Sequence, residues 1–301
     1  MRGAIGLLVT LAVVSAAPAA GTQAPKTTTR VLRTAVAARA IQPGELVVVT
    51  ITSSLPLDSV AVRAFGRDVP ASSVRSQTWQ ALVGIDVDVR PASYTLRVDA
   101  RADGREYSDT TALRVRARTF PTRRLKVDPS FVNPPSDVQP RIADEARVLA
   151  ALWAAPAAER LWTDRFVPPT PGPSSSRFGA LSIFNGEPRG RHTGEDFSGD
   201  EGTPIVAPNA GRVALARDLY FSGNTVVIDH GAGLFSLLAH LSAIDVKAAE
   251  VVTAGQQVGR LGATGRVTGP HLHWAVRLNG ARIDPSSLLA TLGSAFESGN
   301  R

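Results

Sequence analysis

The sequence predicts a mainly β protein with two domains joined by a linker that contains a short helix. Polar and apolar residues alternate between 31 and 118, two proline clusters interrupt the chain between 120 and 173, and a glycine-rich stretch with short apolar runs continues to 289. Alternation is typical of half-buried strands, and proline clusters are typical of linkers. A chain of 301 residues has room for two modest domains.

Residues 1–20 have the features of a signal peptide. A positive Arg2 precedes an apolar run from Ala4 to Val14, and Ala17-Pro-Ala19 fits the small-residue rule for cleavage. We therefore expect export to the periplasm, the cell envelope or the exterior, with no stable membrane insertion after signal removal. The apolar run is short for a bilayer span, and a retained N-terminal anchor is the alternative.

The chain contains no cysteine and has a net charge of +7. The absence of cysteine excludes a thiol nucleophile, a disulfide framework and a lipid-modified cysteine. A basic exported protein would be attracted to an anionic cell envelope. The basic residues are scattered, with few aromatic residues between them for base stacking, so we expect no nucleic-acid partner.

Residues 30–119 are expected to form a small, broadly immunoglobulin-like β-sandwich. Apolar and polar residues alternate in Tyr94-Thr-Leu-Arg-Val-Asp-Ala100, and turn signals such as Gln42-Pro-Gly44 and Ala102-Asp-Gly104 delimit the runs. About seven short strands separated by regular turns are typical of such a sandwich. This stretch has no histidine, so we expect it to position or bind rather than to catalyse.

Residues 120–174 are predicted to be a proline-rich linker with a helix at about 139–155. Apolar residues recur at helical spacing from Ile142 to Trp153, which favours a packing helix with Trp153 in the core. The run Pro168-Pro-Thr-Pro-Gly-Pro173 then interrupts the chain again.

Residues 175–290 are predicted to form a second, antiparallel β domain, followed by a tail at 291–301. Turn signals separate its short apolar runs, and Asn279-Gly280 is a strong hairpin signal among them. The runs predict strands at 212–216, 225–228, 234–239, 257–261 and 273–278.

All five histidines lie in this second domain, and three of them fall in two short segments. A strand would point His271 and His273 to the same face, and His192 and Asp196 can also share a face. Two histidines and one carboxylate suit Zn²⁺ with a fourth position open for water. Ni²⁺, Fe²⁺ and Cu²⁺, and an iron oxygenase, could use the same ligands. An exported chain without cysteine favours hydrolysis at zinc.

The order of these motifs resembles that of the lysostaphin-type (LytM-domain) zinc endopeptidases. The resemblance covers about 175–286 and rests on Ser176-Arg-Phe-Gly179, His192-Thr-Gly-Glu-Asp196-Phe, Ala239-His-Leu-Ser242, Thr264-Gly-Arg-Val-Thr-Gly-Pro-His-Leu-His273 and Ile283-Asp-Pro285. It implies an antiparallel, duplicated-hybrid-motif-like peptidase fold with a groove. It also implies cleavage of peptide bonds in bacterial cell-wall peptidoglycan, with peptidoglycan peptides as partners.

The resemblance further implies a role for each histidine of the two segments. His192, Asp196 and His273 would bind one Zn²⁺ per chain. His240 and His271 would line the cleft as catalytic residues, and an imidazole that titrates near neutral pH suits the proton transfers.

Other residues receive weaker assignments. Asn185 and Arg189 match groove positions of the family and would bind substrate. Glu195 is expected to face away from the ligands into solvent, and His230 to be a structural or surface histidine. Alternation from His273 places Trp274 in the core.

One departure from the family concerns the stretch after Phe178-Gly179. Relatives frequently have a basic residue there, whereas this chain has Ala180-Leu-Ser182. The departure affects the expected shape of the groove, not the metal site.

We interpret the chain as an exported zinc endopeptidase that uses metal-activated water. The alternative is a non-enzymatic LytM-domain scaffold or activator of other cell-wall hydrolases, but such proteins typically lack part of the metal set. A pure wall-binding module would leave the complete set of histidines and aspartate unexplained. We also expect that the linker or the sandwich could cover the groove.

Overall fold

The computed structural model describes residues 31–295. The predicted signal peptide at 1–20 and residues 296–301 of the predicted tail lie outside the described residues. In the part of the chain that the structure describes, neither α-helix combines the length and the apolar character that a membrane span requires.

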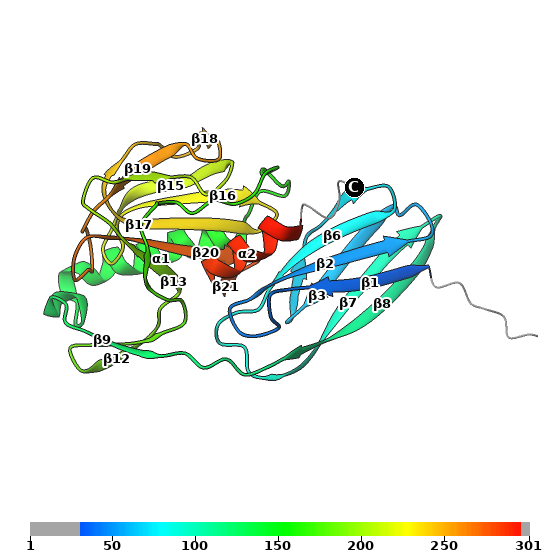
Figure 1. The fold of residues 1–301 in the computed structure, drawn as a ribbon, viewed down its shortest axis with the longest axis horizontal. Coiled ribbons are helices and arrows are strands. Elements are labelled where there is room, and N and C mark those ends of the chain that lie inside the picture. The colour runs from blue at the N-terminus through cyan, green and yellow to red at the C-terminus, as the bar shows by residue number, and fades with distance from the viewer. Residues whose placement is uncertain (1–30, 296–301) are drawn as a thin grey trace, which may run out of the picture. The chain divides into compact units, whose positions relative to one another are not determined.

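The N-terminal β domain consists of two four-stranded sheets, with strand orders β1-β2-β6-β5 and β4-β3-β7-β8 (Figure 1, blue to cyan). Inward-facing residues of both sheets share one core, in which Val49 and Leu96 are fully buried. The alternating pattern therefore produces the sandwich that it predicts; the immunoglobulin-like strand order stays a prediction. The strands are β1 Leu32–Ala37, β2 Leu46–Ser53, β3 Ser59–Ala64, β4 Arg67–Val69, β5 Ala71–Arg75, β6 Thr78–Gly84, β7 Ala92–Ala102 and β8 Arg105–Val115.

The C-terminal β domain is built on a ten-stranded sheet whose main path is β10-β13-β20-β17-β16-β15-β18 (Figure 1). The five predicted strands lie within β15, β16, β17, β19 and β20, and the mainly β fold is confirmed. The strands are β10 Ser174–Ser176, β13 Gly194–Ser198, β14 Pro204–Val206, β15 Gly211–Leu219, β16 Gly223–Gly231, β17 Leu234–Ile244, β18 Val251–Val252, β19 Gln257–Leu261, β20 His271–Leu278 and β21 Ala281–Ile283.

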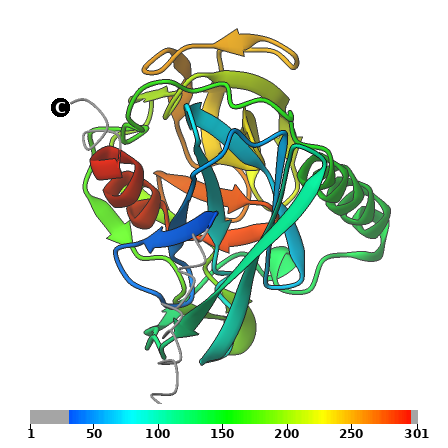
Figure 2. The same ribbon diagram turned by 90° about the vertical axis from the view of Figure 1, so that its right-hand side faces the viewer.

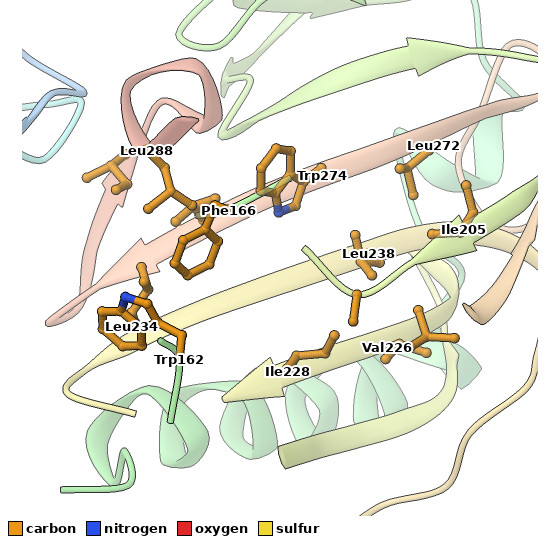
Figure 3. Close-up of a cluster of buried hydrophobic side chains, with 14 of the residues drawn as sticks. Trp162, Phe166, Ile205, Val226, Ile228, Leu234, Leu238, Leu272, Trp274 and Leu288 are labelled. Carbon is orange, nitrogen blue, oxygen red and sulfur yellow. The ribbon is translucent and has the colours of Figure 1, made fainter. Parts of the chain in front are cut away.

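One face of this sheet packs into the main hydrophobic core. Leu272 and Trp274 of β20 are completely buried there, as alternation along the strand predicts. Two aromatic residues of the linker, Trp162 and Phe166, lie in the same core, with ring centres 5.7 Å apart (Figure 3). The linker is therefore part of the folded domain, because burial of each large apolar side chain stabilises it by about 1.5–3 kcal/mol.

The two α-helices cover opposite faces of the sheet (Figure 2, α1 in green and α2 in red). Helix α1, Gln139–Ala154, spans the predicted helical segment, and its Trp153 is partly buried against Phe235 with ring centres 5.1 Å apart. Helix α2, Pro285–Ala295, buries Leu288 and Leu292 in the main core. It continues through 291–295, where the sequence predicts a tail, because Leu292 has an apolar site there.

The linker also contributes a strand to a small sheet of the C-terminal domain. Strand β9, Thr122–Leu125, pairs in parallel with β11, Leu181–Phe184, which pairs with β12, Glu187–Arg191. Beyond β9, the amide of Asn185 accepts a hydrogen bond from Val127 N at 3.0 Å and donates one to Val127 O at 2.9 Å. Two short 3-10 helices, η1 Pro129–Phe131 and η2 Ser136–Val138, connect this region to α1.

A cluster of charges joins the N-terminal domain to the C-terminal domain. Arg39 contacts Glu45 at 2.9 Å and Asp284 at 3.2 Å, and Arg118 contacts the same Asp284 oxygen at 2.7 Å. The Ser287 hydroxyl donates to Glu45 Oε2 at 2.8 Å. We call these five residues the interface cluster; within it, both arginines have carboxylate partners.

Candidate metal centre

Strands β13 and β20 bring three predicted site residues together. Their antiparallel register places Asp196 directly opposite His273. Because neighbouring residues alternate between faces, both side chains point away from the core that holds Phe197 and Trp274. His192, just before β13, is held by backbone hydrogen bonds to Ala180 and Gly179 and completes the group.

Three ligand atoms of this group converge. His192 Nε2 lies 2.9 Å from Asp196 Oδ1 and 3.0 Å from His273 Nδ1, and the third edge, from His273 Nδ1 to Asp196 Oδ1, is 2.8 Å. Ligand atoms of a tetrahedral Zn²⁺ with bonds of about 2.0–2.1 Å lie roughly 3.3 Å apart. The triangle is slightly smaller than that and needs little expansion, so these residues fit a metal ion with two nitrogen donors and one oxygen donor.

Neighbouring groups fix the orientation of these side chains. His192 Nδ1 donates to Arg177 O at 3.1 Å, which leaves the lone pair of Nε2 for the site. Gly194 makes room for the other imidazole, because a Cβ at this position would lie 2.6 Å from His273 Cε1 and 2.5 Å from Trp274 O. Burial would raise the pKa of Asp196, but hydrogen bonds with His192 and His273 outweigh it and hold this pKa well below its usual range.

Arg123, from the linker strand β9, contacts the same carboxylate. Its Nη1 donates to Asp196 Oδ2 at 2.9 Å and to Ser176 Oγ at 2.8 Å, and its Nε donates to Ser182 Oγ at 2.9 Å. The guanidinium therefore engages one carboxylate oxygen, while the other faces the two histidines. This arrangement favours ligation through Oδ1 alone.

Sequence reasoning missed Arg123 because it lies 73 residues before Asp196 in a stretch interpreted as a linker. The one available signal was the basic residue missing after Phe178-Gly179. In the parallel register of β9 and β11, Arg123 stands opposite Ser182, at the end of that same stretch. A basic residue is therefore present at the site, but the linker strand β9 supplies it.

The two remaining predicted histidines lie beside the metal group. Their ring centres are 4.8 Å apart, and the His240 ring is 6.0 Å from that of His273. His240 Nδ1 donates to Thr264 O at 2.9 Å, and His271 Nδ1 contacts Gly269 O at 2.8 Å. The register of β17 shifts around His240, whose φ of 66° is left-handed. An irregularity of this kind re-aims a side chain, here toward the cleft.

Burial determines the charge state of His240. Burial, followed by the charges of the neighbouring His273 and His271, lowers the pKa of His240 to about 3. The ring is therefore neutral near pH 7, with its proton on Nδ1 and the lone pair of Nε2 available.

These groups line a cleft of about 610 Å³. The linker borders it at more than one place, with Arg123, Leu125 and Val127 from the β9 segment and Leu149 and Trp153 from α1. The sequence predicted that the linker could cover the groove; in the structure it supplies walls and leaves this volume open.

Only one of the two predicted substrate-binding residues lines the cleft. Arg189 lines the cleft and pairs with Glu187. Asn185 does not line it, since both ends of its amide are engaged by the Val127 backbone. The docked linker therefore engages the polar atoms of Asn185, and its role as a substrate contact stays a prediction.

Three residues near the site belong to the protein interior. Trp274 is in the core, as expected, and its Nε1 donates to Ser236 Oγ at 3.1 Å. His230 is fully buried between Ala210 O and Ser236 Oγ, at 2.8 and 3.0 Å, and is structural. Glu195 faces away from the ligands, but the expectation that it is solvated is wrong, because it is buried and accepts from Ser286 Oγ at 2.9 Å.

Comparison with known proteins identifies a family and a solved structure that is similar over most of the chain. The model of Peptidase family M23 matches residues 190–285. A crystal structure from Pseudomonas aeruginosa, assigned to peptidase M23, is 31% identical and has a TM-score of 0.64. The match covers 83% of this chain and 95% of that one.

Two curated relatives are similar over about a third of this chain. The peptidoglycan DD-endopeptidase ShyA of Vibrio cholerae is 42% identical over 93 residues, which are 31% of this chain and 22% of ShyA. The DD-carboxypeptidase/endopeptidase Mpg of Neisseria meningitidis is 41% identical over 97 residues, which are 32% of this chain and 22% of Mpg. The chain thus spans about a fifth of the length of the curated relatives that it matches.

Proposed function

Since the chain belongs to peptidase family M23, we propose that it is an exported zinc endopeptidase that cleaves peptide bonds in bacterial cell-wall peptidoglycan. The observation that carries the proposal is the convergence of His192 Nε2, Asp196 Oδ1 and His273 Nδ1 beside two further histidines in one cleft. The name of ShyA, a peptidoglycan DD-endopeptidase, supports peptidoglycan as the substrate, and the name of Mpg supports endopeptidase activity. The signal-like residues 1–20 support export.

In this proposal His192, Asp196 and His273 hold one Zn²⁺ per chain. The bound ion supplies an activated water at neutral pH and polarises the scissile carbonyl. The protein fixes the three ligand atoms through Arg177 O, Gly194 and the Arg123 guanidinium.

His240 and His271 carry out the proton transfers. The neutral His240 ring presents Nε2 as a base, because Thr264 O holds its Nδ1 proton. Burial disfavours the imidazolium that results, so the proton passes on readily to the leaving amine. His271, with Nδ1 fixed at Gly269 O, shares this work from an adjacent position.

The first experiment is hydrolysis of purified peptidoglycan by the mature protein, with zinc measured on the same sample. We expect about one zinc per chain, as three protein ligands imply, and release of new amino termini. His273→Ala should lose both zinc and hydrolysis. A protein that binds zinc and cleaves no wall preparation would favour the scaffold alternative, and a protein without zinc would contradict the metal site.

A further inference from the structure

Arg266 is a cation in the cleft that has no anionic partner among the described residues. It lies in the loop between β19 and β20, and its Cζ is 4.6 Å from the ring centre of Phe184 and 4.8 Å from that of Phe221. Within residues 31–295, its guanidinium has no carboxylate within 4.0 Å and no hydrogen-bond acceptor, and only its backbone N–H is bonded, to Phe221 O.

The surroundings of Arg266 make this isolation unfavourable. The residue is half-buried, and four other arginines line the same cleft, namely Arg123, Arg189, Arg191 and Arg277. Arg123 pairs with Asp196, Arg189 with Glu187 and Arg191 with Asp88, whereas Arg266 and Arg277 have no carboxylate within 4.0 Å among the described residues. Arg277 lies over the Trp153 ring of α1, and Arg266 lies on the loop that leads to His271 at the start of β20. Burial lowers the pKa of Arg266, and the charges of Arg123 and Arg189 lower it further.

Stacking on the aromatic rings explains only part of this arrangement. The rings attract the positive charge by about 0.5–2 kcal/mol each, which can hold the guanidinium in place. They offer its five N–H donors no oxygen acceptor. A planar carboxylate supplies both the charge and paired acceptors in the matching geometry.

We propose that Arg266, with Arg189 of the same cleft, forms a subsite for a carboxylate of the peptide substrate. This proposal rests on the proposed function, since it places a carboxylate-bearing peptide in the cleft that contains the metal group. The subsite selects anionic peptides and sets their position relative to His240 and His271. The carboxylate comes either from the C-terminus of the peptide or from an acidic side chain.

The test uses matched peptides that differ in one carboxylate. One carries both a free C-terminus and an acidic side chain, and two others have one or the other group converted to the carboxamide. For the zinc-loaded wild type, loss of the bound carboxylate should raise KM about 10- to 100-fold with a smaller change in kcat, since a charge-assisted hydrogen bond is lost. The carboxamide that shows this effect identifies the source of the carboxylate.

Variants of Arg266 assign the effect to this residue. Arg266→Gln should reduce the preference for the carboxylate peptide to near unity, and Arg266→Lys should restore it in part, because Lys keeps the charge but not the planar fork. Arg212→Gln, an exposed arginine outside the cleft, is the matched control and should keep the full preference. An equal effect of Arg266→Gln on all three peptides would overturn the proposal.

Calorimetric binding separates this proposal from the proposed function. The zinc-loaded His240→Ala protein should bind the carboxylate peptide more tightly than its carboxamide, and the additional change Arg266→Gln should abolish the difference. If the wild type cleaves no peptide but this difference is present, the subsite stands and the proposed function fails. If peptides are cleaved and no such difference exists, the subsite is wrong and the proposed function stands.

Discussion

Arginines gather in two regions of this protein with different surroundings. In the interface cluster, Arg39 and Arg118 share the carboxylates of Glu45 and Asp284. In the cleft, Arg123, Arg189 and Arg191 have carboxylate partners, whereas the side chains of Arg266 and Arg277 have none in the described part of the chain and lie over aromatic rings.

This difference separates groups that maintain the fold from groups available to a ligand. A charge removed from water costs several kcal/mol unless a partner compensates it, so a region with purely structural charges is expected to be neutralised. The interface cluster meets this expectation, and the cleft does not. Substitutions in the cleft should therefore change function with little loss of stability, and those in the interface cluster should do the reverse.

The largest expected effect lies in the cleft, at His240. His240→Ala should lower kcat on peptidoglycan by about 10²- to 10⁴-fold, because a positioned base is lost, while zinc content and the unfolding midpoint stay near those of the wild type. His240→Asn is the matched variant, since Asn tolerates the left-handed backbone at this position. Loss of zinc in both variants would show instead that His240 is a ligand.

The complementary change is Asp284→Asn in the interface cluster. It leaves Arg39 and Arg118 with one carboxylate fewer and should lower the free energy of unfolding by about 3 kcal/mol. The value is at the lower end for a buried pair because the Arg39 side chain is 37% exposed. Urea denaturation measures the loss, and zinc content should not change. Asp218→Asn, in an exposed pair with Arg141, should cost much less; equal losses would remove the distinction.

Arg123→Ala combines features of both regions. Arg123 has a carboxylate partner, as the arginines of the interface cluster do, but that partner is Asp196, a proposed metal ligand. We expect zinc affinity to fall about 10- to 100-fold, as is typical when a partner of a metal ligand is removed. Competition with a chelator measures the affinity directly. Arg124→Ala, at the exposed neighbouring position of β9, is the control. Unchanged affinity in Arg123→Ala would reduce its role to packing.

A smaller effect concerns the contribution of His230 to the pH dependence of the free energy of unfolding. Burial lowers the pKa of His230 to about 4 in the folded protein, against about 6.5 in the unfolded chain. Between these values the unfolded chain binds more protons, so stability falls as the pH is lowered, by about 2 kcal/mol from pH 7 to pH 5. His230→Gln should flatten this part of the profile in urea denaturation at both pH values. A variant with the same slope as the wild type would contradict the assignment.

The sequence predicts the strands and the metal group because their signals are local. Alternation along β20 places His271 and His273 on one face and Leu272 and Trp274 on the other, and the structure keeps that division. The partnership of Asp196 with His273 depends on strand pairing, but the family resemblance supplies it without a structure.

The contributions of the linker to the core and to the metal site could not be predicted from the sequence. Three residues of the linker, Trp162, Phe166 and Arg123, contact parts of the chain that are distant in sequence. No repeat or residue spacing in the sequence predicts these contacts. Proline-rich composition indicates only where regular structure stops, and it does not indicate whether the segment then packs against a domain. The position of Asn185 was not predictable for the same reason, since its amide is bonded to the docked linker.

The pairing of β9 with β11 has a consequence for how this protein can be rearranged, in evolution or in the laboratory. A fragment that begins at Arg177 retains all five histidines but lacks the guanidinium that contacts Asp196. It also lacks Trp162 and Phe166 of the core and the wall formed by α1. The smallest exchangeable module therefore begins near residue 120, well before the stretch 190–285 that defines the family. Chimeras joined at the family boundary would inherit the ligands without the residues that hold them in place.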